Sequence, residues 1–314
     1  MTNPTAGDPC AATAAPVAGA LPKLGVGLLY NPSLPEYLDE RPASFDYVEI
    51  IPEMFWNDRG PRSSPRFLEL SGWVELLNWI AGRWPVIAHN IGLSLGSADY
   101  FDRSYAEHIA EWQQRYRFPW HSDHLSFVRI TSEEGHDHNA GLAVPVPYDY
   151  DVLELFAERI EVVQETVPVP FLIENNVYFI DVPDQDMSEP AFLNELCRRT
   201  GCGLLFDVHN LYANARNHGF DAFEFVEQLD LTQVGEIHIA GGSELGGVYT
   251  DSHAGPCPEP VWELLEHVVP RAPNLAGITF EFHDSYYPLL KGDGIEAELR
   301  RSREIWDRRS APAP

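Results

Sequence analysis

Residues 201–221 of this 314-residue chain read GCGLLFDVHNLYANARNHGFD. The stretch begins as a short apolar run that ends abruptly at Asp207. Several side chains with nitrogen or amide groups follow within a few residues, namely His209, Asn210, Asn217 and His218. An apolar strand that stops at a carboxylate and is followed by a loop of such side chains is typical of a metal held at a strand end. The alternative is that Asp207 caps the next helix and the histidines lie on the surface.

The same pattern recurs along the chain, where strand-like and helical runs alternate about eight times. The strand-like runs cover residues 24–30, 45–51, 86–88, 120–127, 171–173, 203–206, 234–242 and 276–284. The main helical runs cover residues 65–82, 105–116, 149–166, 187–201, 221–229, 259–269 and 295–307. This alternation predicts an α/β protein with a single (β/α)8 TIM-like barrel. A doubly wound sheet is the rival, but the glycines of its first strand, LGVGLL, do not form the Gly-rich phosphate turn that such a sheet needs.

We expect one domain over residues 22–307, because no Pro/Gly/Ser-rich linker divides the middle of the chain. Residues 1–21 are rich in Ala, Pro and Thr without a basic start or an apolar core, which predicts a disordered tail and not a secretory signal. Residues 308–314 are expected to be a frayed end.

The composition bounds the function. The net charge of −27 would repel phosphate backbones and anionic membrane surfaces, so we expect neither nucleic acid nor membrane as a partner. The same charge would steer in a cationic peptide, or it serves only solubility. The four cysteines, Cys10, Cys197, Cys202 and Cys257, form no CxxC pair, which favours reduced, buried thiols in a cytoplasmic protein.

Residues that could bind a metal fall at or just past the predicted strand ends. In chain order they are Glu53, His89, Asp123 with His124, Glu174, Asp207, His238 and Glu281. The carboxyl ends of barrel strands converge on one mouth, so these side chains are expected to meet there. Each has a structural explanation when taken alone, as a helix cap or a core histidine, but their recurrence in phase favours a shared site.

So many carboxylates in one mouth need a cationic counter-charge, which a metal would supply. Mixed histidine and carboxylate ligands without thiolate indicate iron, manganese or zinc. The ligands are too many for one ion, so two or three ions are expected, with Glu174 suited to bridge them. Composition does not choose between redox iron and hydrolytic zinc or manganese.

The motifs resemble a known family. AHNIGLSLGS, SDHLSF, LIENN, GCGLLFDVHNLYANARNHG, EIHIAGG, DSH and TFEFHD are similar to the signature blocks of the DUF692 proteins, the multinuclear non-haem iron-dependent oxidative enzymes (MNIO), which include the methanobactin biosynthesis oxidase. The blocks occur in family order from the first strand to the last. The resemblance implies a TIM-like barrel, two or three iron ions in a mixed-valence Fe(II)/Fe(III) state, and O2 as co-substrate.

The resemblance also implies a ligand set and departures from it. The implied metal ligands are His89, His124, Glu174, Asp207, Asn210, His238, Asp251, His253 and Glu281. It implies that Asp123 orients a ligand histidine from outside the ligand set. The family often has Gly where Asn90 stands, Pro where Asn176 stands, and Arg and Asp where Phe282 and His283 stand. These departures bear on the substrate pocket more than on the metal ligands.

Two functions follow as hypotheses. By resemblance, the chain is an iron-dependent oxidoreductase that modifies a ribosomally synthesised precursor peptide, frequently at a cysteine, with a separate partner protein that presents the peptide. The alternative is a metal-dependent hydrolase or sugar isomerase, because xylose isomerase-like barrels also line their mouths with Glu, Asp and His. A non-catalytic metal-binding protein is a third hypothesis. Iron content and O2 consumption discriminate among these hypotheses.

Overall fold

The computed structural model of the chain describes residues 21–131 and 137–309. Most of the predicted tail, residues 1–20, and most of the predicted frayed end, residues 310–314, lie outside the described residues, as does Cys10. Leu21, the last residue of the predicted tail, is only 5% exposed and packs against the barrel, so the folded domain includes it.

Eight of the described strands close into a parallel barrel, which confirms the predicted fold class. In chain order these strands are β1 (Gly25–Leu29), β2 (Tyr47–Ile50), β5 (Val86–His89), β6 (His121–His124), β9 (Phe171–Glu174), β10 (Gly203–Asp207), β11 (Val234–Ala240) and β14 (Gly277–Glu281). Each strand pairs with the next barrel strand in the sequence, and β14 pairs with β1 to close the ring. All carboxyl ends of the strands therefore point to one end of the barrel.

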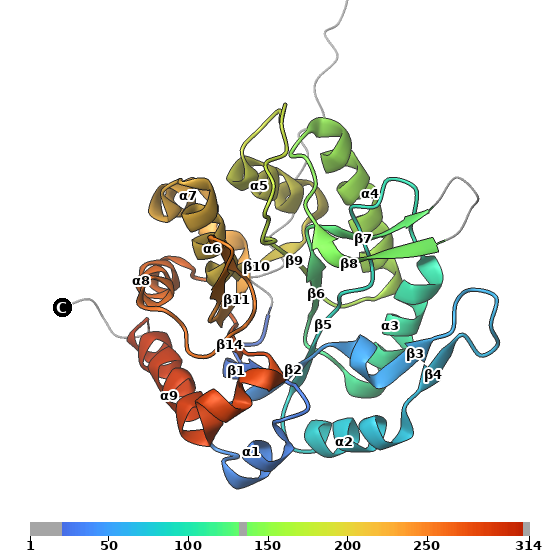
Figure 1. The fold of residues 1–314 in the computed structure, drawn as a ribbon. Coiled ribbons are helices and arrows are strands. Elements are labelled where there is room, and N and C mark those ends of the chain that lie inside the picture. Colours follow the sequence, from blue (N-terminus) through green and yellow to red (C-terminus); the bar gives the residue numbers. More distant parts are fainter. Residues whose placement is uncertain (1–20, 132–136, 310–314) are drawn as a thin grey trace, which may run out of the picture.

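Helices ring the strands (Figure 1). The α-helices are α1 (Pro35–Glu40), α2 (Ser71–Ala81), α3 (Arg103–Tyr116), α4 (Tyr150–Thr166), α5 (Glu189–Thr200), α6 (Val208–His218), α7 (Ala222–Gln228), α8 (Glu259–Val268) and α9 (Tyr287–Arg308). Short 3-10 turns are η2 (Pro52–Phe55), η3 (Leu231–Gln233), η4 (Val269–Arg271) and η5 (Asp284–Tyr286). Among the described residues, no helix is both long and apolar enough to cross a membrane.

Three antiparallel hairpins are added to the barrel, each in the connection that follows a barrel strand. They pair β3 (Trp56–Asp58) with β4 (Phe67–Glu69), β7 (Phe127–Thr131) with β8 (Asp137–Val144), and β12 (Ser243–Leu245) with β13 (Val248–Thr250). Because all three follow carboxyl ends, they surround the mouth of the barrel.

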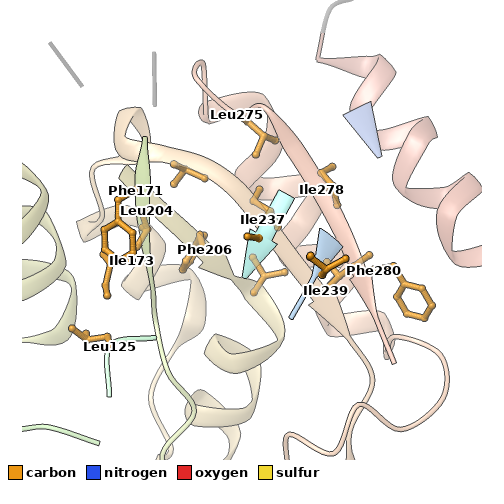
Figure 2. Close-up of a cluster of buried hydrophobic side chains, with 14 of the residues drawn as sticks. Leu125, Phe171, Ile173, Leu204, Phe206, Ile237, Ile239, Leu275, Ile278 and Phe280 are labelled. Carbon is orange, nitrogen blue, oxygen red and sulfur yellow. The ribbon is translucent and has the colours of Figure 1, made fainter. Parts of the chain in front are cut away.

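Side chains along the barrel strands alternate between two layers. In β10, Leu204 and Phe206 pack outward into the large core that the helices cover, whereas Leu205 and Asp207 point inward. Figure 2 shows the outward residues of β9, β10, β11 and β14 in this core. Cys197, Cys202 and Cys257 are buried free thiols, as predicted.

The inward layer is apolar at the amino ends of the strands, apart from the buried Glu236 of β11, and polar at the carboxyl ends. Its apolar part comprises Leu21, Tyr47, Ile87, Trp120, Leu172, Leu205 and Ala276. Two residues further along five of these strands, the inward position carries Glu49, His89, Ser122, Glu174 or Asp207. Since residues i and i+2 of a strand share a face, the apolar residues form a floor directly beneath the polar ones.

Tyr47 fills the centre of this floor and explains two strand glycines. Its hydroxyl lies 2.8 Å from Thr279 Oγ1, and the Thr279 hydroxyl donates to the carboxylate of Glu236 at 2.8 Å. A Cβ atom at Gly27 would lie 2.4 Å from the Tyr47 ring, and one at Gly277 would lie 2.5 Å from its hydroxyl. The first and last strands therefore need glycine to admit this ring.

Local differences from the prediction have physical causes. The helix predicted over 65–82 begins only at Ser71, because residues 67–69 pair as β4 with the strand that follows η2. The closing helix predicted over 295–307 begins earlier, at Tyr287, and is kinked where Lys291 takes a left-handed φ of 50°. The hairpins add strands that the barrel count does not include, because their short runs lack a clear period.

We expect Gly27→Ala to destabilise the domain by about 1–3 kcal/mol, because the added methyl group cannot be accommodated against the buried Tyr47 ring. The matched control is Gly72→Ala, at an exposed position of α2 where the new Cβ meets nothing within 4 Å. This control is expected to be neutral or slightly stabilising, because alanine favours a helix. Urea denaturation of the two variants measures the difference. Equal stability of Gly27→Ala and the parent would contradict the proposed packing.

Candidate metal centre

The predicted ligands meet inside the mouth of the barrel, where the described residues contain three groups whose ligand atoms lie within 4.8 Å of one another. The groups are His89–His124–Glu174, Glu174–Asp207–His238 and Glu49–His238–Glu281. Glu174 belongs to the first two groups and His238 to the last two. The groups are therefore contiguous and not three separate sites.

The first group comes from the ends of β5, β6 and β9. Nε2 of His89 and Nε2 of His124 each lie 3.2 Å from Oε2 of Glu174. The other ring nitrogen of His89 lies 2.8 Å from the hydroxyl of Ser122, which fixes the orientation of the ring. Two histidine nitrogens and one carboxylate oxygen thus converge on one point.

The second group lies around the other oxygen of Glu174. Oε1 of Glu174 is 3.8 Å from Nδ1 of His238, which in turn lies 3.1 Å from Oε1 of Glu281. Asp207 joins this group from the end of β10. The two oxygens of Glu174 therefore face different groups, which is the arrangement of a carboxylate that bridges two ions.

Asp207 serves the fold and the site at once. Its Oδ1 accepts hydrogen bonds from the backbone N–H groups of His209 and Asn210, at 2.7 and 2.9 Å, and so caps α6. The loop predicted after Asp207 is therefore wrong, because this cap starts a helix directly at the end of the strand. The Oδ2 of Asp207 is buried and has no hydrogen-bond partner among the described residues. The two interpretations of this residue from the sequence, helix cap and ligand, are therefore compatible, because each uses a different oxygen.

Asp251 and His253 lie in the loop after β13, next to the second group. Nε2 of His253 is 3.0 Å from Oδ1 of Asp251 and 3.3 Å from Oε2 of Glu281, so Glu281 also faces two sets of residues. The buried His209 holds Asp251, with Nδ1 3.1 Å from Oδ1. Asn210 lines the same cavity, and its buried Oδ1 has no partner in the described part of the chain. These residues form a third candidate position.

Glu49 is a site residue that the strand-end interpretation missed. It is fully buried on β2, and its Oε2 lies 2.9 Å from Nε2 of His238. Because the two nitrogens of an imidazole point in different directions, Glu281 faces the Nδ1 side and Glu49 faces the Nε2 side. Glu49 is thus placed to accept a hydrogen bond from Nε2–H and leave Nδ1 free for a metal. The period of two along residues 47–49 was the signal that could have identified it.

Other histidines and acids of the motifs lie outside these groups. Glu53, at the end of the second predicted strand, accepts from the backbone N–H of Ile91 at 2.8 Å and from the hydroxyl of Tyr105. Asp123 accepts from the backbone N–H groups of Leu93 and His124 and lies 3.8 Å from the His124 ring nitrogen. His218 pairs with Asp181 at 2.7 Å, away from the three groups.

The charges and unpaired atoms of the mouth fit a metal. Burial raises the pKa of Glu174 to about 8 and that of Asp207 to about 6, and the charge of Glu281 adds to both shifts, against the opposing effect of nearby histidines. The buried oxygens Asp207 Oδ2 and Asn210 Oδ1 lack a hydrogen-bond partner in the described ranges. Glu174 Oε2 and Asp251 Oδ1 also make no hydrogen bond there, although histidine ring nitrogens lie within 3.2 Å of each. Cations at their convergence would compensate both the charge and the unpaired acceptors.

The groups open into a cavity of about 450 Å³ at the barrel mouth. The inner end of this cavity is lined by polar residues, namely His89, His124, Glu174, Asp207 and Glu281. Its rim includes apolar side chains from three connections: Ile91, Leu142 and Phe179. These rim residues are 41%, 59% and 47% exposed. A cavity with a buried polar inner end and an exposed apolar rim suits an extended ligand that inserts one side chain.

Comparison with known proteins identifies the family. The family described as RiPP precursor modification enzyme MbnB/TglH/ChrH matches residues 23–306. The chain is similar to a UPF0276 protein of Caulobacter vibrioides (strain NA1000 / CB15N), with 32% identity over 283 residues that cover 90% of this chain and 94% of that protein. The chain therefore belongs to the MbnB/TglH/ChrH family, which confirms the DUF692 resemblance.

Solved structures confirm the fold. The chain is similar to endonuclease IV from Thermus thermophilus, with a TM-score of 0.54, 17% identity, and coverage of 91% of this chain and 100% of that chain. It is also similar to D-psicose 3-epimerase from Clostridium cellulolyticum, with a TM-score of 0.52, 10% identity, and coverage of 91% and 96%. These likenesses show the fold, and the family description indicates an enzyme.

We expect Glu49→Ala to weaken metal binding about 10–100-fold, because His238 loses the carboxylate that orients its ring. Glu49→Gln should retain more of the affinity, because an amide oxygen can still accept from Nε2–H. The control is Glu53→Gln, a partly buried glutamate that binds the loop at Ile91 and not the metal groups. Chelator competition with metal analysis measures the affinities. Parent-like affinity in Glu49→Ala would rule out this role.

Proposed function

We propose that this member of the MbnB/TglH/ChrH family is an iron-dependent oxidoreductase that uses O2 to oxidise a residue, in particular a cysteine, of a ribosomally synthesised precursor peptide. The observation that carries the proposal is that Glu174 and Glu281 each direct their two oxygens toward different sets of ligands. Such carboxylates support a centre of two or three adjacent ions in place of one.

The ligand types favour iron. The three groups offer histidine nitrogens and carboxylate oxygens, and no cysteine belongs to any of them among the described residues. Mixed nitrogen and oxygen ligands suit non-haem iron, although they also suit manganese and zinc. The chain belongs to a family of RiPP precursor modification enzymes. Its motifs also resemble those of the multinuclear non-haem iron-dependent oxidative enzymes, and these motifs contain the same ligand positions. Both facts favour iron over manganese and zinc.

The residues of the chain have separable tasks in this proposal. His89, His124 and Glu174 would hold one ion; Glu174, Asp207, His238 and Glu281 a second; and Asn210, Asp251, His253 and Glu281 a third. Bound iron, in a mixed-valence Fe(II)/Fe(III) state, supplies the capacity to activate O2 and accept electrons from the substrate. Ser122 orients the ring of His89, and Glu49 orients the ring of His238. His209 orients the carboxylate of Asp251.

The mouth supports a peptide as the substrate. Its cavity is open enough to admit a side chain, and its exposed apolar rim can contact the residues on either side of that side chain. A cysteine that enters the mouth would lie next to the candidate metal ligands, where proximity to cations favours the thiolate. We further propose that a separate partner protein presents the peptide, because the described residues consist of the barrel and its hairpins.

The first test is metal content and O2 consumption. We expect aerobically purified protein to contain more than one iron per chain and to consume O2 with a cysteine-containing precursor peptide. Elemental analysis and an oxygen electrode give both readouts. One zinc ion per chain without iron, in protein that is active on a phosphoester or a sugar, would replace this proposal with the hydrolase or isomerase alternative.

The second test concerns the third position. The His253 side chain is 26% exposed, whereas those of His89, Glu174 and His238 are at most 4% exposed, and His253 lies in a loop with a left-handed φ of 49°. A more exposed site on a loop should bind its ion most weakly. We expect His253→Ala to bind one ion fewer while the remaining pair stays bound.

The control for this test is His267→Ala, because His267 lies on α8 and pairs with Glu227 far from the mouth. It should keep the metal stoichiometry of the parent. An unchanged stoichiometry in His253→Ala would remove Asp251 and His253 from the ligand set and leave them a structural role before the following helix.

A further inference from the structure

A second pocket lies beside the mouth and shares a wall with it. The pocket has a volume of about 300 Å³ and is bounded by the connection into α4, the connection after β9, the start of α5 and α7. The shared wall is the segment after β9. Val177 and Phe179 of this segment line the mouth, whereas Tyr178 and Ile180 line the pocket. The two cavities are therefore separated by the thickness of one chain.

The walls of the pocket combine aromatic rings with carboxylates. Tyr148, Tyr178, Phe220 and Phe225 supply the rings. Asp181, Glu189, Asp221 and Glu224 supply the carboxylates. No lysine or arginine lines the pocket in the described part of the chain, and a nearby histidine, His218, pairs with Asp181.

Glu189 is the buried acid of this pocket. Glu189 is only 6% exposed, and its Oε1 has no hydrogen-bond partner among the described residues. The hydroxyl of Tyr148 hydrogen-bonds to the carboxyl group, and burial raises the pKa of Glu189 to about 8. A cation bound beside this group would favour its ionised form and complete its contacts, which offsets the cost of burial.

The chemistry of the walls selects an organic cation. A metal ion would need several oxygen ligands that converge, but the other three acids of the pocket are exposed and only Glu189 is buried. Aromatic rings instead contact an alkyl chain and attract the cation at its end. A lysine or arginine side chain has both parts.

We propose that this pocket binds a lysine or arginine side chain of the precursor peptide, with Glu189 as its counter-ion. The identification of the peptide rests on the proposed function, whereas the recognition of a basic side chain does not. An extended peptide advances about 3.3 Å per residue, so a chain that crosses the shared wall places a basic residue a few positions from the one in the mouth. Phe179 and Ile180, 47% and 60% exposed on that wall, would be covered by the crossing residues.

The first experiment tests the pocket without iron, O2 or turnover. N-acetyl-arginine amide and its neutral isostere N-acetyl-citrulline amide are titrated into the full-length protein, and binding is followed by ligand-observed NMR at millimolar concentrations. We expect the arginine probe to bind the parent, and to bind Glu189→Gln at least tenfold more weakly. The citrulline probe should bind both proteins weakly.

The matched control is Glu161→Gln, which removes the same charge from an exposed position of α4 and should bind like the parent. Glu224→Gln, at the exposed rim of the pocket, should weaken binding by a smaller factor than Glu189→Gln, and it keeps the test decisive if Glu189→Gln fails to fold. Equal binding of the two probes, or parent-like binding in both pocket variants, would overturn the proposal.

The second experiment tests the link to the peptide. Peptides of the form acetyl-Arg-(Gly)n-Cys-amide, with n varied, are compared with N-acetyl-arginine amide. A peptide long enough to span the wall should bind more tightly than the arginine probe alone, and this gain should disappear in Glu189→Gln. If the arginine probe binds but no length gives a gain, the peptide assignment fails and a basic residue of a partner protein becomes the source. Failure of the iron and O2 test would leave the first experiment unaffected.

Discussion

The two-residue period of the barrel strands is the constraint on which this molecule depends. Each strand turns one side chain out to the helices and the next one in to the barrel axis, so a single strand serves the core and the site with alternate residues. Tyr47, Ile87, Trp120, Leu172 and Leu205 form an apolar floor, and the residue two positions later on each of these strands begins the polar layer. Closure of the sheet then brings polar side chains from strands far apart in sequence within a few ångströms.

The polar layer is unusual for a protein interior, because it buries several carboxylates close together. Carboxylates without cationic partners are expensive to bury, and the raised pKa values of Glu174 and Asp207 reflect that cost. The apolar floor and the outer core compensate by burying the remaining strand residues almost completely. The mouth thus concentrates unsatisfied acceptors in one place, where a cation gains the most from binding. The same reasoning distinguishes Glu189, whose neighbours are aromatic rings and not other ligands.

The sequence predicted the barrel and most of its candidate ligands because both depend on a regular signal. Apolar runs that end in Asp, Glu or His recur with each strand, and strand ends share one face of the barrel. Glu49 was not predicted because it lies inside a strand. The pattern of polar residues at strand ends indicated Glu53 instead. Glu53 turns out to anchor the loop at Ile91. The three hairpins were also not predicted, because short paired strands are defined by partners in space and not by a pattern of their own.

The first turn of α6 carries Asp207 as its cap, His209 against Asp251, and Asn210 with a free oxygen. Their relative positions are set by the geometry of one helix, whose cap and backbone hydrogen bonds are made by the chain itself. This part of the centre is therefore preorganised, and binding an ion there requires little reorganisation of the backbone. A displacement of the helix would also move all three groups together as a rigid body. Packing defects on the distant side of α6 could thus perturb the chemistry without touching a single ligand.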